Sequence, residues 1–309
     1  MCESDNQRGC LRQQLWVYLD MKQIAILVPE TAVVEAIADP RYMFTAVNEF
    51  LKSVDKEPIF QVKLIGLSSE VRLADGVISI HTDAVVKDAS RPDLIIIPAI
   101  SGPLDTALTL NKDFLPWIVD CYHLGTEVAS LCIGAFLLAE TGLLNGKSCS
   151  THWLFANEFR NRYPEIELVD DRIVTEQSGI YSSGGANSYW NLLLYLVEKY
   201  TNREMAILAS KYFVLDIERS SQSPFSIFKG QKIHNDPDIV KVQEYIEANY
   251  QDKITVDELC DRFGIARRTF ERRFKKATNN TVLEYWQRVK IEAAKRQLEM
   301  SRKTIGEVM

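Results

Sequence analysis

The chain has 309 residues, of which 46% are apolar and 25% charged, a composition that excludes a wholly disordered protein. This length leaves room for about two domains. The net charge of -6 excludes a protein that is basic throughout. No run is long and apolar enough to cross a membrane, and residues 1–14 lack the apolar core of a signal peptide. We therefore expect a cytoplasmic protein that does not bind or span a membrane. Residues 1–20 are expected to form a disordered extension.

Four short apolar runs predict the strands of one sheet, at residues 22–29, 62–67, 93–98 and 127–131. Runs that are apolar on both faces are typical of a parallel sheet covered by helices on both sides. Helical patterns lie between and after these runs, at residues 40–52, 112–124, 186–200 and 202–213. The alternation predicts a doubly wound, flavodoxin-like α/β domain over residues 21–217.

The junction EVASLCIGAFLLAETGLL predicts a strand that runs directly into a helix, with Cys132 at the turn and Gly134 two residues later. Such a nucleophile elbow exposes its side chain, and the helix N-terminus lowers the pKa of a thiol. His152, twenty residues on, is a candidate partner for the thiolate. A small buried cysteine and a hydrogen-bonded structural histidine are the alternatives. The two residues together leave both a shared pocket and two structural roles open.

The six cysteines contain no CxxC pair and no zinc-ligand spacing, and they lie at Cys2, Cys10, Cys121, Cys132, Cys149 and Cys260. This scatter predicts reduced thiols, not a disulfide framework. We expect neither a metal site nor a cofactor.

Residues 218–237 mix Ser, Pro, Gly and charge and predict a linker, and a helix is expected from Asp238 to Tyr250. Residues 253–276 then predict two helices around a turn. Thr255 and Glu258 form a capping-box pattern, and Gly264 supplies the turn. The second helix, from about residue 266 to 276, buries the pair Phe270 and Phe274.

This second helix is strongly basic, because residues 262–276 contain seven basic residues and one acidic residue. A helix–turn–helix of this charge is suited to a DNA groove, although a solvated helical hairpin is the alternative. Arg268, Glu271 and Arg272 share one face. Arg267, Lys275 and Lys276 are placed for phosphates, whereas Arg273 is ambiguous between a phosphate contact and the domain interior. Glu271 has the alternative of pairing with Arg267 or Lys275.

Three segments, VASLCIGAFLLAETGLLNGK, STHW and YSSGGANSYWNLLLYLVEKY, resemble the ThiJ/PfpI superfamily, whose fold is glutamine-amidotransferase-like. Residues 238–309 resemble an AraC/XylS-type DNA-binding domain, with a long connecting helix from about Val282 to Met300. The order of the two resembles GlxA-type transcriptional regulators. The resemblance implies that Arg268, Glu271 and Arg272 read bases, arginine at guanine and glutamate at cytosine. It also implies that the SQSPF motif of the linker docks on a domain.

The chain departs from catalytic members of the superfamily at two positions. Catalytic members carry an acidic residue four positions before a proline. In this chain the proline is Pro40, so the matching residue is Ala36. The adjacent Glu35 is expected to point elsewhere. Their glycine-rich oxyanion turn reads Ala-Ile-Ser101-Gly102. Without these supports, Cys132, Ile133, His152, Ser101 and Gly102 are expected to line a ligand pocket and not to catalyse a reaction.

The sequence therefore predicts a homodimeric transcription regulator that binds operator DNA under control of an unknown small molecule. A cysteine-dependent amidase or hydratase and a redox sensor based on Cys132 are the alternatives. AraC-type domains carry two helix–turn–helix units, and the capping pattern at Thr304 to Glu307 begins the second just before Met309. We therefore expect weakened DNA binding from a truncated domain, and an inert truncation product is a third alternative.

Overall fold

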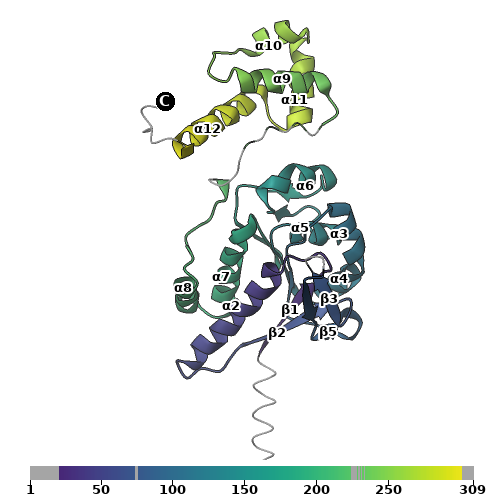
Figure 1. The fold of residues 1–309 in the computed structure, drawn as a ribbon, viewed down its shortest axis with the longest axis vertical. Coiled ribbons are helices and arrows are strands. Elements are labelled where there is room, and N and C mark those ends of the chain that lie inside the picture. The colour runs from purple at the N-terminus through teal and green to yellow at the C-terminus, as the bar shows by residue number, and fades with distance from the viewer. Residues whose placement is uncertain are drawn as a thin grey trace, which may run out of the picture. The chain divides into compact units, whose positions relative to one another are not determined.

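The computed structural model describes residues 21–73, 76–223, 228, 230, 232 and 234–300 (Figure 1). The chain divides into two compact units, Met1–Phe225 and Ser226–Met309. This division falls inside the predicted linker. The predicted extension over residues 1–20 and the capping pattern at Thr304 to Glu307 lie outside the described residues.

The first unit is built on a seven-stranded sheet in the order β10-β11-β7-β6-β1-β2-β5. Its strands are β1 (Lys22–Val28), β2 (Phe60–Gly66), β5 (Ala84–Val85), β6 (Leu94–Ile97), β7 (Glu127–Ser130), β10 (Val174–Gln177) and β11 (Ile180–Ser183). All neighbours pair in parallel except β10, which pairs antiparallel to β11. The four strands predicted from apolar runs are the adjacent central ones, and the α/β prediction is confirmed.

Helices cover both faces of this sheet (Figure 1). One face carries α2 (Glu35–Lys52), α7 (Tyr189–Tyr200) and α8 (Arg203–Tyr212), and the other carries α3 (Leu104–Asn111), α4 (Leu115–His123) and α5 (Gly134–Glu140). Alternate residues of β1 enter opposite cores: Ile24 and Ile26 lie in one cluster, Ala25 and Leu27 in the other. The period of two along a strand thus explains why a central strand is apolar throughout.

Shorter elements complete the unit. They are the strands β3 (Glu70–Leu73), β4 (Ile78–His81), β8 (Ser148–Cys149) and β9 (Glu167–Leu168), the helix α6 (Ala156–Arg162), and the 3-10 turns η1 (Val86–Asp88), η2 (Lys112–Phe114), η3 (Trp153–Phe155) and η4 (Ala186–Ser188). Helix α2 begins five residues before the predicted start, with Pro40 inside it. Burial of Ala36 and Ile37 against the sheet compensates for the backbone hydrogen bond that proline cannot make.

The second unit packs α9 (Pro237–Ala248), α10 (Val256–Phe263), α11 (Arg267–Thr278) and α12 (Val282–Met300) around one apolar cluster. Gly264 ends α10 in the left-handed conformation at φ 63°, which glycine adopts without strain. Phe270 and Phe274 are fully buried, with ring centroids 5.7 Å apart. The predicted turn and phenylalanine pair are therefore confirmed.

The predicted capping box at the start of α10 is also confirmed. The Glu258 amide donates to Thr255 Oγ1 at 3.2 Å, and the Thr255 amide donates to Glu258 Oε2 at 2.8 Å. Thr281 and Glu284 repeat the arrangement before α12, at 3.2 and 2.7 Å. Each box satisfies two amides that the helix itself leaves unpaired.

Thr255→Ala removes one of these acceptors, and we expect it to lower the free energy of unfolding of the second unit by about 1 kcal/mol. Urea unfolding followed by circular dichroism measures the change. Thr269→Ala, at an exposed position of α11, serves as the control and should stay within about 0.5 kcal/mol of the parent. Equal effects of the two substitutions would show that the box adds nothing.

Candidate ligand pocket and nucleic-acid interface

Cys132 lies at the turn from β7 to α5 with φ 52°, in the left-handed region that non-glycine residues rarely occupy. Its backbone is held on both sides: the Cys132 amide donates to Ser183 Oγ at 3.2 Å, and its carbonyl accepts from Thr151 Oγ1 at 3.0 Å. Gly134 allows the close approach behind it, since a Cβ there would lie 2.4 Å from the Pro98 carbonyl oxygen. The backbone has the geometry expected for the elbow.

The thiol of Cys132 is buried, which is one of the two possibilities that the sequence left open. Cys132 is only 4% exposed and lies in the same buried cluster as Ala36 and Ala99. Burial raises the pKa of the Cys132 thiol to about 12, although a hydrogen bond from the Ile133 backbone opposes the shift. Of the two possibilities left open by the sequence, the buried cysteine fits this environment better than a reactive thiolate, because loss of solvation outweighs the stabilisation at the start of the helix.

His152 has a structural partner in the described part of the chain. Its Nδ1 accepts from the Leu154 amide at 3.1 Å and so caps η3. Burial lowers the pKa of His152, which favours the neutral ring. Among the described residues, no hydrogen bond joins His152 to Cys132. The structural alternative weighed for this histidine therefore fits its observed contact.

An acid that the sequence reasoning missed lies near the elbow. Ala36 is fully buried and Glu35 is exposed, as expected. One turn along α2, Asp39 Oδ2 accepts from the Tyr189 hydroxyl at 2.5 Å. Burial, and then the charge of Glu35, raises the pKa of Asp39, while this hydrogen bond lowers it. The sequence held a signal for this carboxylate. Asp39 lies three residues after Ala36, and residues three apart on a helix lie on the same face.

Tyr189 connects Asp39 with the elbow. The pKa of Tyr189 is raised mainly by burial. The hydrogen bond to Asp39 raises it further, and so do nearby negative charges, including that of an ionised Cys132. Tyr189 belongs to the same buried cluster as Cys132. The acid thus approaches the thiol through a tyrosine and not by direct contact.

The turn after β6 is already occupied by internal hydrogen bonds. The Ser101 amide donates to the Thr31 carbonyl at 2.7 Å, and Ser101 Oγ donates to the same oxygen at 2.9 Å. Gly102 follows at φ 81°. An oxyanion would have to displace Thr31 to use this amide, which agrees with the departure seen in the sequence.

Helix α11 carries the predicted DNA-contacting residues, and ion pairs divide them. Arg267 binds Asp257 at 2.9 Å and Glu271 at 3.2 Å. Arg273 binds Asp236 at 2.5 Å and Asp238 at 2.9 Å, which ties α11 to the start of α9. Glu271 thus makes the Arg267 pair that was its alternative, and the partly exposed Arg273 pairs with two carboxylates of the same unit.

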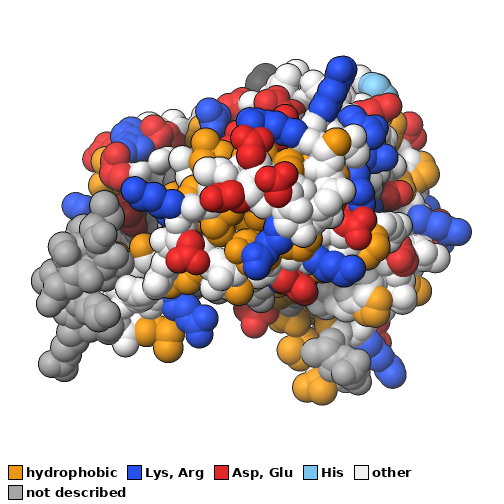
Figure 2. Space-filling view, turned by 90° about the horizontal axis from the view of Figure 1, so that it is seen from above, with side chains coloured by type: hydrophobic (Ala, Val, Ile, Leu, Met, Phe, Trp, Pro, Cys, Tyr) orange, Lys and Arg blue, Asp and Glu red, His pale blue; other side chains and the backbone are white. Residues whose placement is uncertain are grey.

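The other basic side chains of α11 point away from these pairs. Lys275 Nζ donates to the Asn279 carbonyl at 2.9 Å and lies 3.8 Å from Glu284. For Arg268, Arg272 and Lys276, all exposed, the structure records no hydrogen bond or ion pair with any residue in its described ranges. Figure 2 shows basic side chains next to acidic ones on this view of the surface, not one unbroken basic patch.

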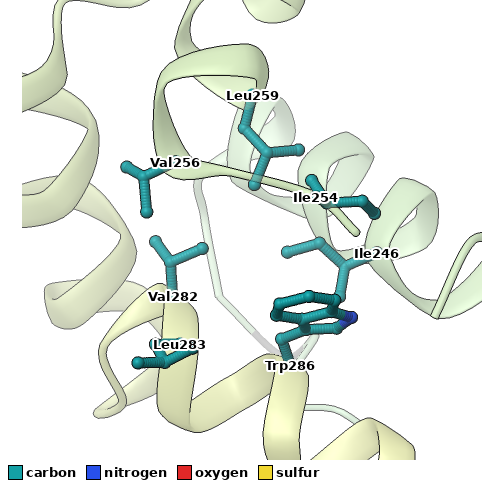
Figure 3. A pocket seen from close by; sticks show the side chains of 7 residues that line it. All are labelled: Ile246, Ile254, Val256, Leu259, Val282, Leu283 and Trp286. Carbon is teal, nitrogen blue, oxygen red and sulfur yellow. The ribbon is translucent and has the colours of Figure 1, made fainter. Parts of the chain in front are cut away.

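A small apolar hollow lies within the second unit, between α9, α10 and α12 (Figure 3). Its lining consists of Ile246, Ile254, Val256, Leu259, Val282, Leu283 and Trp286. Its volume of about 30 Å³ holds about one water molecule. The Trp286 indole N–H already donates to the Tyr250 carbonyl at 3.2 Å. The hollow is too small for a metabolite.

Comparison with known proteins assigns both units. Residues 42–199 match the DJ-1/PfpI family, which covers just over half of the chain, and residues 259–309 match a helix-turn-helix domain. The chain belongs to the DJ-1/PfpI family. The resemblance to ThiJ/PfpI proteins joined to a DNA-binding domain is confirmed.

Among its relatives is the HTH-type transcriptional regulator GbdR of Pseudomonas aeruginosa, 24% identical over 240 residues, which are 77% of this chain and 64% of GbdR. The HTH-type transcriptional regulator GlxA of Rhizobium meliloti is 21% identical over 187 residues, 60% of this chain and 57% of GlxA. This chain therefore spans less than two thirds of the length of either relative.

The crystal structure of a putative transcriptional regulator from Vibrio parahaemolyticus has a TM-score of 0.56 at 21% identity, covering 62% of this chain and 98% of that one. It shares the fold of the first unit. Over the described ranges, no helix combines the length and apolar character that a membrane span needs. The same residues contain no cluster of His, Cys, Asp or Glu that could hold a metal ion.

The buried thiol gives a kinetic prediction. We expect iodoacetamide to alkylate the Cys132 peptide at least about tenfold more slowly than an unstructured cysteine peptide at pH 8. Because the thiolate fraction rises with pH up to the pKa, the rate should increase through pH 10 without levelling off. Mass spectrometry of the folded protein measures both. Rapid alkylation that levels off near neutral pH would instead support the amidase, hydratase or redox-sensor alternatives.

Proposed function

We propose that this protein is a transcription regulator of AraC type that binds operator DNA through α11, under control of a small molecule sensed by the DJ-1/PfpI unit. The observation that carries the proposal is the exposed pair Arg268 and Arg272 on a helix anchored by Phe270 and Phe274. Residues four apart on a helix lie on one face, so both guanidinium groups can enter the same groove.

The ion pairs refine the roles of the basic residues. Arg268 and Arg272 are the base-reading candidates, since arginine bonds guanine in bidentate fashion. Lys275 and Lys276, together with the partly neutralised Arg267, are placed for phosphates. Glu271 orients Arg267 at 3.2 Å, and Arg273 secures the helix through Asp236. The Arg273 pairs thus fix α11 against the start of α9, whereas the Glu271 pair lies within α11 itself.

Two features support a sensing role without catalysis for the first unit. The Cys132 thiol, with a pKa of about 12, supplies almost no thiolate at neutral pH. The Ser101 amide is already bound to the Thr31 carbonyl, so this amide is not free to stabilise an oxyanion. A fold that hosts enzymes elsewhere can bind ligands here, because function depends on the site and not on the fold.

The ligand site that we propose lies around the elbow and is lined by Cys132, Ile133, His152, Ser101 and Gly102. The hydrogen-bonded pair Asp39 and Tyr189 adds polar groups to it. A ligand that binds one conformation of this site better than another shifts the population of the whole protein. We propose that the protein acts in the cytoplasm as a homodimer, which presents two copies of α11 to paired half-sites.

The DNA half of the proposal is tested with duplexes selected from a randomised library by the parent protein. We expect Arg268→Ala and Arg272→Ala each to weaken binding to the selected duplex by about 1–3 kcal/mol and to relax its sequence preference. Fluorescence anisotropy at fixed salt gives both values.

Arg72→Ala is the matched control, because it removes an exposed arginine from the first unit. Its affinity should equal that of the parent. Binding that survives the double substitution of Arg268 and Arg272 would contradict the assignment of α11.

The sensing half is tested by a thermal-shift screen with a library of small water-soluble metabolites, followed by DNA affinity measurements with each stabilising compound. We expect at least one compound to change the affinity about fivefold or more, the lower range of measured allosteric couplings. Asp39→Asn should weaken its effect, while Glu57→Gln, at an exposed position, should not. Identical DNA affinities with every compound in the library would contradict the sensor role.

A further inference from the structure

Residues 220–222, at the end of the first unit, are bound to the loop before β10. The Ile173 amide donates to the Ser220 carbonyl at 3.1 Å, and the Gln222 amide donates to the Asp171 carbonyl at 2.9 Å. Ser221 pairs with Arg172 in an isolated antiparallel bridge. The start of the predicted linker, within the SQSPF motif, is thus docked on the DJ-1/PfpI domain.

The side chain of Gln222 makes the deepest of these contacts. It is 1% exposed, and its amide nitrogen donates to the carbonyls of Asp170 at 2.8 Å and Thr151 at 3.1 Å. Its oxygen accepts from the Gly185 amide at 2.7 Å. Because these partners are backbone groups, any change in Gln222 leaves buried polar groups unsatisfied, which is costly.

Gly184 provides the space for this side chain. A Cβ at Gly184 would lie 2.5 Å from the Gln222 amide nitrogen, closer than any real contact. The two residues are therefore matched in shape. The side chain of Gln222 is therefore fixed both by its hydrogen bonds and by its fit against Gly184.

The same two segments that hold Gln222 also hold the elbow. Thr151, whose carbonyl accepts from Gln222, donates its hydroxyl to the Cys132 carbonyl at 3.0 Å. Ser183, one residue before Gly184, accepts from the Cys132 amide at 3.2 Å. The Cys132 carbonyl thus bonds directly to Thr151, a partner of Gln222, and the Cys132 amide bonds to Ser183, two residues before Gly185, another partner of Gln222.

We propose that Gln222 is a latch that couples the site around Cys132 to the start of the linker. A ligand that moves Cys132 from its left-handed conformation shifts Thr151 and Ser183 and so loosens Gln222, which changes how residues 220–222 are held. Strained residues are suited to such switching, because they persist only while their surroundings hold them. The consequence for DNA rests on the proposed function, whereas the coupling inside the first unit does not.

The test is hydrogen–deuterium exchange of the full chain carrying Gln222→Ala, without DNA. We expect the amides of Gly185, Gly184 and Cys132 to exchange at least about tenfold faster than in the parent, while those of the central strand β6 stay unchanged. Ser221→Ala is the matched control, because it removes one exposed hydroxyl that donates to the Asp171 carbonyl at 2.9 Å. It should leave the Cys132 amide unaffected. Exchange that quickens only at residues 220–222 would overturn the coupling.

Gln222→Met keeps the length of the side chain, loses its hydrogen bonds and brings no charge into this buried place, so it tests the coupling where the alanine variant does not fold. DNA affinity on the selected duplex is then compared between the parent and the latch variants. A change of at least threefold with Gln222→Ala or Gln222→Met, and none with Ser221→Ala, supports control through the latch. Equal DNA affinities of the parent and the Gln222 variants overturn control of DNA binding through the latch, even where hydrogen–deuterium exchange is altered. Failure of the parent to bind any duplex contradicts the proposed function instead, and the exchange result is then judged separately.

Discussion

The left-handed backbone of Cys132 is the constraint around which the first unit is organised. Such a conformation is unfavourable for a side chain with a Cβ and survives only where several neighbours hold it. Here Ser183 holds the amide and Thr151 the carbonyl, while Gly134 lets α5 approach the carbonyls at the end of β6. These contacts come from three segments distant in sequence, so the elbow depends on the whole sheet being formed.

The same geometry does not carry the same chemistry. An elbow presents a reactive thiolate only if solvent or charge stabilises the anion, and Cys132 is instead buried among apolar neighbours such as Ala36 and Ala99. At the position where catalytic relatives carry an acid, Ala36 leaves an apolar surface, and the carboxylate one turn along α2, Asp39, is bonded to Tyr189. Desolvation therefore keeps the Cys132 thiol protonated. The left-handed backbone at Cys132 is the feature that we propose for conformational change.

In the second unit, ion pairs divide the basic side chains of α11 into paired and unpaired ones. Arg273 is held by two carboxylates at the start of α9, and Arg267 by one on α10 and one on α11. An arginine that already forms an ion pair gains less free energy from binding a phosphate than an unpaired arginine, because it must first leave its carboxylate partner. Arg268 and Arg272 are exposed and make no such pair with a described residue, which is why we propose them for sequence recognition.

The sequence by itself determined the elements with a local cause: the central strands through apolar runs, α10 through its capping box and Gly264, and the buried face of α11 through Phe270 and Phe274. It also determined the family, through ordered motifs. The strands β5, β10 and β11 escaped prediction because they have only two to four residues each, too few to show a clear apolar pattern. Only the tertiary structure decided the pKa of Cys132, the bond of Asp39 to Tyr189 and the burial of Gln222, because solvation and long-range hydrogen bonds depend on which segments meet in space.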